Sequence, residues 1–419
     1  MNLMKAFGID VLFYGSSKAL VAVTWIVIIS TLTKHLSPAN YATFWQIFTL
    51  IVGAATIVTT GLVTAFRRYY GQFEQNKTTD LYSFAATGVT RTVISLGLLC
   101  FVPAFLISAY IGEWPRSGSL FALAIFSFGS AALFQIYSGH LMAKRKTTYF
   151  LAMTTAQAVL FLAFCSLGIF SGDAKDVLLA VLFLGLSYVA VVQPWSLTAI
   201  RRTFRPFRNT ETRKWEREFL FFGLPLAFMN GAFLLGNMGI QLIIANMASP
   251  YDAGIYAAFS APIERLVGFM ASIAAMAFLP LVAVKWDQNQ RSEVLRFLGL
   301  VVAAVALIST VISILLVIFN DQWVTLIIDK RYKSGIDLIP VLCAATTVST
   351  IASILADVLI VEKKTVHLAV FFTISSIVGL VFSAVLIPIA GVSGAVLGRL
   401  ISAVFACMLI CFSIWRSLR

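Results

Sequence analysis

The sequence predicts an all-α, polytopic membrane protein with about 12 transmembrane helices. Hydrophobic residues make up 60% of the 419 residues and charged residues only 12%, whereas soluble domains carry about 25% charged residues. The apolar residues form successive long runs with short polar connections, and each run is close to the length of about 20 residues that crosses a bilayer as a helix. The runs are too long and too uniformly apolar for the alternating strands of a membrane barrel.

The apolar runs define the expected helices in chain order. They are 9–33, 41–64, 82–109, 118–141, 148–170, 177–199, 219–248, 254–283, 294–319, 336–361, 366–389 and 391–415. The first run contains Lys18 and lacks a small-residue cleavage site, so it is interpreted as a retained helix and not as a signal peptide.

The longest polar stretch, residues 201–218, contains seven basic residues near the midpoint of the chain. Short basic loops stay on the cytoplasmic side of a membrane. With the amino terminus inside, the inner loops and chain ends hold about 21 Lys and Arg residues against about six in the outer loops. Both termini are therefore expected to be cytoplasmic, and the stretch is interpreted as a basic cytoplasmic linker between a six-helix half at 1–200 and another at 219–419.

The two predicted halves share a pattern. Ser37-Pro38 before one helix corresponds to Ser249-Pro250 before another at the equivalent place in the second half. Each half begins inside and has an even number of helices, so the halves are expected to run parallel. Such repeats enclose a central cavity at mid-depth of the membrane.

Four basic residues fall near the middle of predicted helices. Counting 1.5 Å per residue from the nearer helix end places them roughly 12–17 Å deep. Together they would cost about 10 kcal/mol if exposed to lipid, so we interpret them as lining a hydrated cavity that receives an anionic substrate. These candidate substrate-binding residues are Lys18, Arg91, Arg265 and Arg399. The alternative is that each cation pairs with a carbonyl or an acid and fixes helices together.

Three acidic residues are candidates for ion coupling: Asp10, Glu264 and Asp357. A carboxylate in a low-dielectric environment can take up a proton, so H⁺ or Na⁺ could drive transport through them. A salt bridge to Arg265 or a helix cap is the structural alternative.

Other functional classes find little support in the sequence. There is no phosphate-binding G-x-x-x-x-G-K-[ST] motif, and the outer loops are short, so an enzyme is not expected. The basic residues are distributed over alternating loops, which does not favour nucleic-acid binding. The five cysteines lie in apolar runs without His or carboxylate partners at ligand spacing, so no metal site and no cofactor is expected.

Two glycine-containing segments suggest local roles. Gly391, Gly394, Gly398 and Ser402 form a small-residue stripe that favours close helix packing. Gly223-x-Pro225 is a candidate hinge, because proline removes a helical hydrogen bond.

The stretch LTKHLSPANYATFWQIFTLIVGAATIVTTGLVTAFRRYY at 32–70 resembles the polysaccharide transporter family, as do FGLPLAF at 222–228 and AGIYAAF at 253–259. This family belongs to the multidrug/oligosaccharidyl-lipid/polysaccharide (MOP) flippase superfamily. The resemblance implies a Wzx-type flippase of a bacterial inner membrane that translocates undecaprenyl-diphosphate-linked O-antigen or exopolysaccharide repeat units for lipopolysaccharide or other polysaccharide biosynthesis. Polysaccharide polymerase and chain-length proteins are candidate partners. Many members carry Asp-Arg where this chain has GNMGIQ at 236–241, so a substrate contact there cannot be transferred.

Two other functions stay open at this point. A cation-coupled multidrug antiporter of the same superfamily is the main alternative, although the surplus of basic residues argues against a cavity for cationic drugs. A scaffold in a glycan-assembly complex is the other, and it would tolerate neutralisation of the mid-membrane charges.

Overall fold

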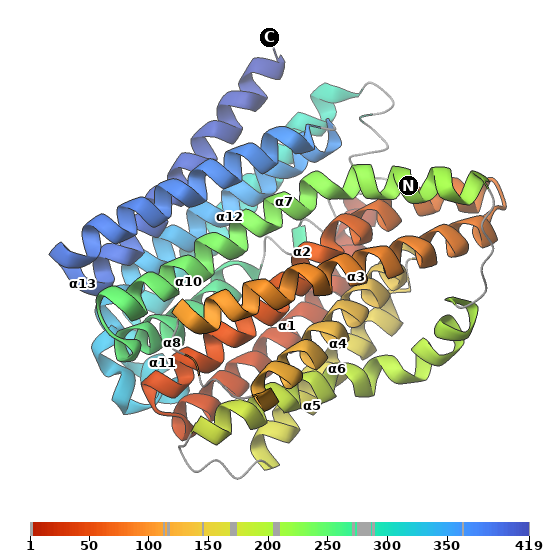
Figure 1. The fold of residues 1–419 in the computed structure, drawn as a ribbon. Coiled ribbons are helices and arrows are strands. Elements are labelled where there is room, and N and C mark those ends of the chain that lie inside the picture. The colour runs from red at the N-terminus through yellow and green to blue at the C-terminus, as the bar shows by residue number, and fades with distance from the viewer. Residues whose placement is uncertain are drawn as a thin grey trace. The chain divides into compact units, whose positions relative to one another are not determined.

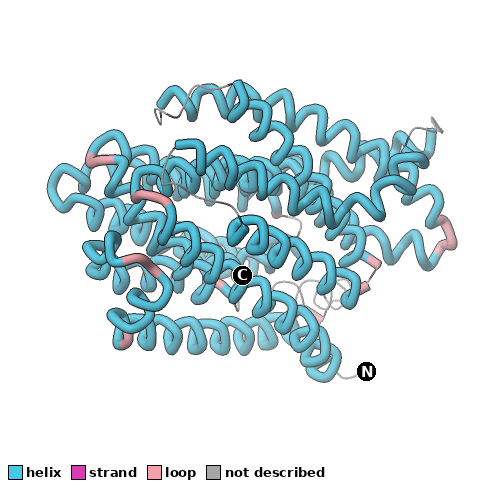
Figure 2. The backbone as a smooth tube through the Cα atoms, turned by 90° about the horizontal axis from the view of Figure 1, so that it is seen from below, coloured by secondary structure: helices cyan, strands magenta, loops and turns pink. Residues whose placement is uncertain are grey.

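The computed structural model describes residues 3–111, 114, 118–144, 146–167, 174–203, 210–269, 273–274, 286, 290–362 and 364–418. All regular structure in these ranges is helical, as Figure 2 shows. The elements, labelled in Figure 1, are α1 (Leu3–His35), α2 (Pro38–Gln75), α3 (Thr79–Ile111), α4 (Gly118–Ala143), α5 (Thr147–Leu167), α6 (Ala174–Thr203), α7 (Thr210–Met247), α8 (Pro250–Val267), α10 (Arg291–Ile318), α11 (Asn320–Ile327), the 3₁₀ helix η1 (Lys330–Leu338), α12 (Ile339–Val361) and α13 (Thr365–Leu418).

The helices have the length and composition of membrane spans. Among the described residues, nine helices are long and apolar enough to cross a bilayer, and Ala19–His35 of α1 is a shorter apolar segment. The prediction of an all-α, multi-pass membrane protein is confirmed.

Most of the basic stretch 201–218 belongs to helices and not to a loop. Helix α6 continues to Thr203 and α7 begins at Thr210, so only 204–209 lie between them, outside the described residues. The first turns of α7 continue as helix because their residues also pack. Thr212 is buried, and the ring of Trp215 lies 4.6 Å from that of Phe73 on α2. Residues 210–218 are therefore helical, although most of their side chains are exposed, and their role as a cytoplasmic linker stays a prediction.

The last two predicted helices form one hairpin, α13. Gly391 separates them with φ +57° and ψ −141°, a conformation that only glycine adopts readily. On either side of this turn, a side chain at Gly394 would collide with the backbone of Leu386, and one at Gly398 with Ser383. Ser402 donates a hydrogen bond of 2.7 Å to the Ser375 carbonyl. The predicted close packing is confirmed at Gly394, Gly398 and Ser402, but not at Gly391, whose Cβ position has no atom within 4 Å.

The predicted helix 254–283 corresponds to α8 over its first part only. Helix α8 ends at Val267, and most of 270–289 lies outside the described residues.

The helices group into two contact units, which do not follow the chain order. One unit contains the described residues up to Gln46 and from Leu235 onward, and the other contains Ile47 to Leu167 and Ala174 to Leu234. The division into halves 1–200 and 219–419 stays a prediction, as does the hinge at Gly223-x-Pro225. In the second unit the backbones of Gly61 and Gly223 touch directly. All contacts of the candidate site lie inside the first unit.

Candidate functional site

Helix α8 is the platform of the candidate site. Ser249 caps it by accepting a hydrogen bond of 3.0 Å from the backbone N–H of Asp252, and Pro250 follows, a residue suited to the first turn of a helix. Eleven consecutive residues, Ala253 to Ile263, are buried, so the helix is fixed along most of its length. It ends shortly after Glu264 and Arg265, where Gly268 caps it.

Arg399 of α13 joins this platform through an ion pair. Its Nη1 lies 2.6 Å from Oε1 of Glu264 and donates a hydrogen bond of 3.1 Å to the hydroxyl of Tyr256. The Arg399 side chain is 11% exposed and that of Glu264 is 38% exposed. The carboxylate is therefore the more exposed member of the pair.

Arg265 is surrounded by aromatic rings. Its Cζ lies 4.4 Å from the ring centre of Trp25 on α1 and 5.3 Å from that of Trp45 on α2. Both tryptophans are buried. Its Nη1 also donates a hydrogen bond of 3.3 Å to the carbonyl of Ala261, one turn earlier. Stacking on indole orients the guanidinium plane, and its N–H edge is then suited to binding an oxyanion.

The structure brings together three of the predicted site residues. Glu264 and Arg265 are neighbours on α8 and Arg399 is paired with the first of them. The alternative that a mid-membrane cation pairs with an acid thus describes Arg399 in this conformation. The salt bridge that the sequence analysis offered as an alternative for Glu264 was with Arg265. Glu264 pairs with Arg399 instead.

Of the remaining predicted residues, Arg91 and Asp357 lie elsewhere. Arg91 is exposed on α3, in the second contact unit. Asp357 is buried on α12, beside the hydrophobic cluster that contains Ile354 and Val358. The side chains of Lys18 and Asp10 lie outside the described residues. None of these four is assigned to the candidate site formed by Glu264, Arg265 and Arg399.

Sequence reasoning did not predict the contributions of Tyr256, Trp25 and Trp45. The only local signal was the aromatic residue shared by the two S-P repeats, which is Phe44 in the first and Tyr256 in the second. No spacing rule connects a tryptophan at 25 with an arginine at 265. Among the described residues no group of three metal-binding side chains occurs.

The fold is that of membrane transporters of the MOP superfamily. A mutant of the Vibrio cholerae MATE transporter superposes with a TM-score of 0.76 at 11% identity, covering 100% of this chain and 98% of the other. An inward-facing multidrug resistance MATE transporter gives 0.71 at 13% identity, with 96% and 94% covered. A MOP superfamily transporter from Pyrococcus furiosus, described as having a binding pocket of reverse polarity that suggests a different function, gives 0.73 at 14% identity, with 97% and 95% covered.

Comparison of the sequence with family models identifies the family. The family model described as polysaccharide biosynthesis protein matches residues 8–285. The chain therefore belongs to the polysaccharide biosynthesis protein family, as the resemblance predicted. No curated protein sequence matches the chain.

Proposed function

We propose that this protein is a flippase that moves an undecaprenyl-diphosphate-linked oligosaccharide across the inner membrane of a bacterium by alternating access. The observation that carries the proposal is the cluster of Arg265, Arg399 and Glu264, in which Glu264 pairs with Arg399 while the neighbouring Arg265 lies over the ring of Trp25. Its formal charge of +1 favours an anionic head group. Family membership supports a substrate from polysaccharide synthesis.

The two arginines have different proposed roles. Arg265, stacked between indoles, presents a planar fork that can bind a pyrophosphate oxygen pair with charge-assisted hydrogen bonds. Arg399 binds the second phosphate when Glu264 releases it. The released carboxylate is then free to bind a coupling ion, so the ion pair with Arg399 favours Glu264 among the three candidate coupling residues.

The second candidate function is a cation-coupled multidrug antiporter. The half-exposed carboxylate of Glu264 favours it, since a cationic drug could compete with Arg399 for this group. The fold is shared with MATE transporters, but a pocket of reverse polarity also occurs on this fold.

The two functions can be distinguished in inverted inner-membrane vesicles. We would measure lumenal exposure of the lipid-linked oligosaccharide with and without the protein, together with accumulation of an organic cation dye. We expect protein-dependent exposure of the oligosaccharide, reduced at least tenfold by Arg265→Ala, because the fork that binds pyrophosphate is lost.

The matched control is Arg296→Ala, which removes an exposed arginine from α10 and should leave exposure unchanged. Both variants must be present in the membrane at the level of the parent protein. Normal oligosaccharide exposure in Arg265→Ala would overturn the proposed site. Dye accumulation without oligosaccharide exposure would favour the antiporter.

A further inference from the structure

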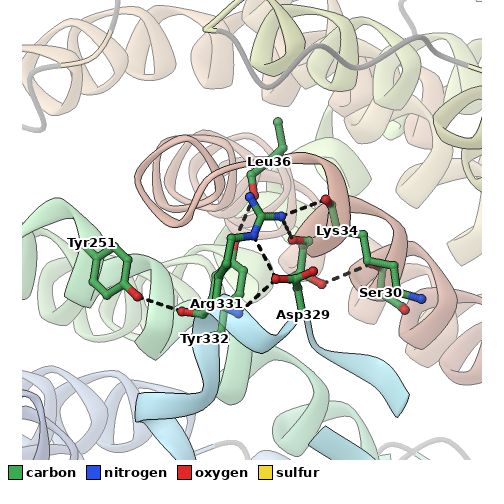
Figure 3. Close-up of polar contacts among 8 residues, drawn as sticks. Ser30, Lys34, Leu36, Tyr251, Asp329, Arg331 and Tyr332 are labelled. Carbon is green, nitrogen blue, oxygen red and sulfur yellow. Dashed lines mark hydrogen bonds and ion pairs between the residues drawn. The ribbon is translucent and has the colours of Figure 1, made fainter. Parts of the chain in front are cut away.

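The end of α1 contacts a segment almost 300 residues away in the chain. Arg331 donates hydrogen bonds from Nη2 to the carbonyls of Thr33 (3.1 Å) and Lys34 (2.8 Å), in the last turn of α1. Its Nε donates to Oδ1 of Asp329 at 2.8 Å, which orients the guanidinium. Figure 3 shows this arrangement. Since the last carbonyls of a helix lack helical partners and carry partial negative charge, a cation there is well placed.

The contact between this segment and the end of α1 also includes buried groups. Tyr332 is fully buried and its hydroxyl donates a hydrogen bond of 3.2 Å to the carbonyl of Leu36. Close by, Gly254 of α8 packs against the carbonyl of Pro38 so tightly that no Cβ would fit. Tyr251 donates a hydrogen bond of 2.7 Å to the Arg331 carbonyl. We call the group of Asp329, Arg331, Tyr332 and the carbonyls they bind the Arg331 latch.

The polar part of the latch is suited to opening. The side chains of Arg331 and Asp329 are 45% and 28% exposed, and exposed ion pairs exchange readily with water. Although partial burial opposes its charge, hydrogen bonds from the backbone N–H and guanidinium of Arg331 keep the pKa of Asp329 below its ordinary value. The carboxylate thus stays charged at neutral pH and titration does not open the latch there.

An aromatic column connects the latch to the candidate site. The ring of Tyr332 meets the ring of Tyr41 edge-on at 5.9 Å, and Tyr41 stacks on Trp45 at 6.0 Å with 19° between the planes. Trp45 in turn contacts the guanidinium of Arg265. Tyr332, Tyr41 and Trp45 are all buried, so a shift at either end requires the next ring to move.

We propose that the Arg331 latch closes the outer end of the transport path and that the Tyr332–Tyr41–Trp45 column makes its opening depend on the ligand at Arg265. In this role Tyr41 and Tyr332 are positioning residues. The inference rests on the proposed function and on the predicted orientation, in which residues 34–40 and 329–337 are outer loops.

Closure is tested with a cysteine reporter below the latch. Ala257, buried on α8 between Gly254 and Arg265, is replaced by cysteine in full-length protein whose five native cysteines are alanine. A membrane-impermeant maleimide is then applied to spheroplasts, where only the outer face is accessible. We expect Arg331→Ala to increase the labelling rate at least fivefold.

Two further variants keep this test informative. Lys333→Ala is the matched control, because Lys333 lies in the same 3₁₀ helix and forms only an exposed ion pair of 3.7 Å with Asp321; its labelling rate should stay within twofold of the parent. Tyr332→Phe removes one hydroxyl and retains the packing, and we expect an increase of about fivefold for the loss of one hydrogen bond of about 1 kcal/mol.

Coupling is tested with the same reporter in nanodiscs, using undecaprenyl diphosphate as the probe. We expect the probe to raise the labelling rate at least threefold in the parent. Tyr41→Leu interrupts the column, so it should abolish this response while probe binding, measured separately, stays within twofold.

The outcomes separate this inference from the proposed function. Equal labelling of Arg331→Ala and Lys333→Ala would overturn the closure by the latch, even if oligosaccharide transport is normal. A full response to the probe in Tyr41→Leu would overturn the coupling. Faster labelling in Arg331→Ala, with no oligosaccharide transport by the parent, would retain the closure and reject the flippase.

Discussion

Arg265 owes its orientation to two buried indole rings on different helices, at 4.4 and 5.3 Å. Cation–π contacts of this kind contribute about 1–2 kcal/mol when they are shielded from water. The geometry of the site should therefore depend on residues that need not touch the substrate.

We predict that Trp45→Leu weakens binding of undecaprenyl diphosphate about fivefold, because about 1 kcal/mol of guanidinium orientation is lost. Binding is measured by titration in nanodiscs. Trp415→Leu, at a half-exposed position of α13, is the control and should bind as the parent does. Equal affinities of the two variants would contradict the role of Trp45.

The ion pair of Glu264 and Arg399 should contribute to stability as a unit. We predict a coupling energy of about 1–2 kcal/mol between Glu264→Gln and Arg399→Met in a double-mutant cycle of thermal unfolding. Each single variant leaves a partly buried charge without its partner, and the double variant removes both. We expect a coupling energy no larger than this because solvent screens the Glu264 carboxylate, whose side chain is 38% exposed.

The comparison pair for this cycle is Lys333 and Asp321, whose side chains are 65% and 68% exposed. Their coupling should be near zero. Additive effects at Glu264 and Arg399 would show that the pair does not stabilise the fold.

At this scale the sequence identified Arg265, Arg399 and Glu264, since charged residues are conspicuous in apolar helices. It could not identify their partners. Trp25 and Trp45 look like ordinary aromatic residues of apolar runs, and only the packing of α1 and α2 against α8 brings them to Arg265.

Among the helices, the hairpin α13 shows how a single backbone position determines an element. A Cβ at Gly391 would meet no atom within 4 Å, so the need for glycine comes from its positive φ alone. Its neighbours Gly394 and Gly398 are needed for the opposite reason, because other atoms occupy the space of a side chain.

We predict that Gly391→Ala destabilises the protein by about 1–3 kcal/mol, the usual cost of a side chain in this backbone region. Thermal unfolding in detergent or nanodiscs measures the effect. Gly299→Ala is the matched control: this glycine also has free space around its Cβ position but lies within helix α10, where alanine is favoured. A stabilising effect at both positions would contradict the strained turn.

The apolar runs predicted most helices within a few residues, because a bilayer-spanning helix is defined by its hydrophobic length. The ends were less predictable. Helix α2 continues past its apolar run to Gln75, and α7 begins nine residues before the predicted start, at Thr210. Both extensions contain aromatic residues that pack against one another, as Trp215 does against Phe73.

For the whole molecule, the sequence predicts the direction of the chain through the membrane. About 21 basic residues on one side against about six on the other favour cytoplasmic termini. The contact units add information that no sequence pattern contained, because they place residues before Gln46 with residues after Leu235. Such grouping depends on long-range packing and not on the order of the helices.

We predict that a green fluorescent protein fused after Arg419 is fluorescent, because the distribution of basic residues predicts a cytoplasmic carboxyl terminus. Alkaline phosphatase inserted at Ser334, in the predicted outer loop, should be active. Each reporter functions on one side of the membrane only. Inactive phosphatase at Ser334 combined with a non-fluorescent fusion after Arg419 would therefore reverse the orientation and place the Arg331 latch on the inner face.

The latch has a consequence for how the sequence can vary. On the α1 side, Arg331 and Tyr332 bind only main-chain carbonyls, those of Thr33, Lys34 and Leu36. These acceptors are present whatever side chains occupy the three positions. Mutations there should consequently be tolerated by the latch, whereas position 331 can accept no other residue without losing the fork. As far as the latch is concerned, homologues can therefore differ at positions 33, 34 and 36 while they retain an arginine at 331. In a comparison of sequences, that arginine would then show no partner residue that is retained with it.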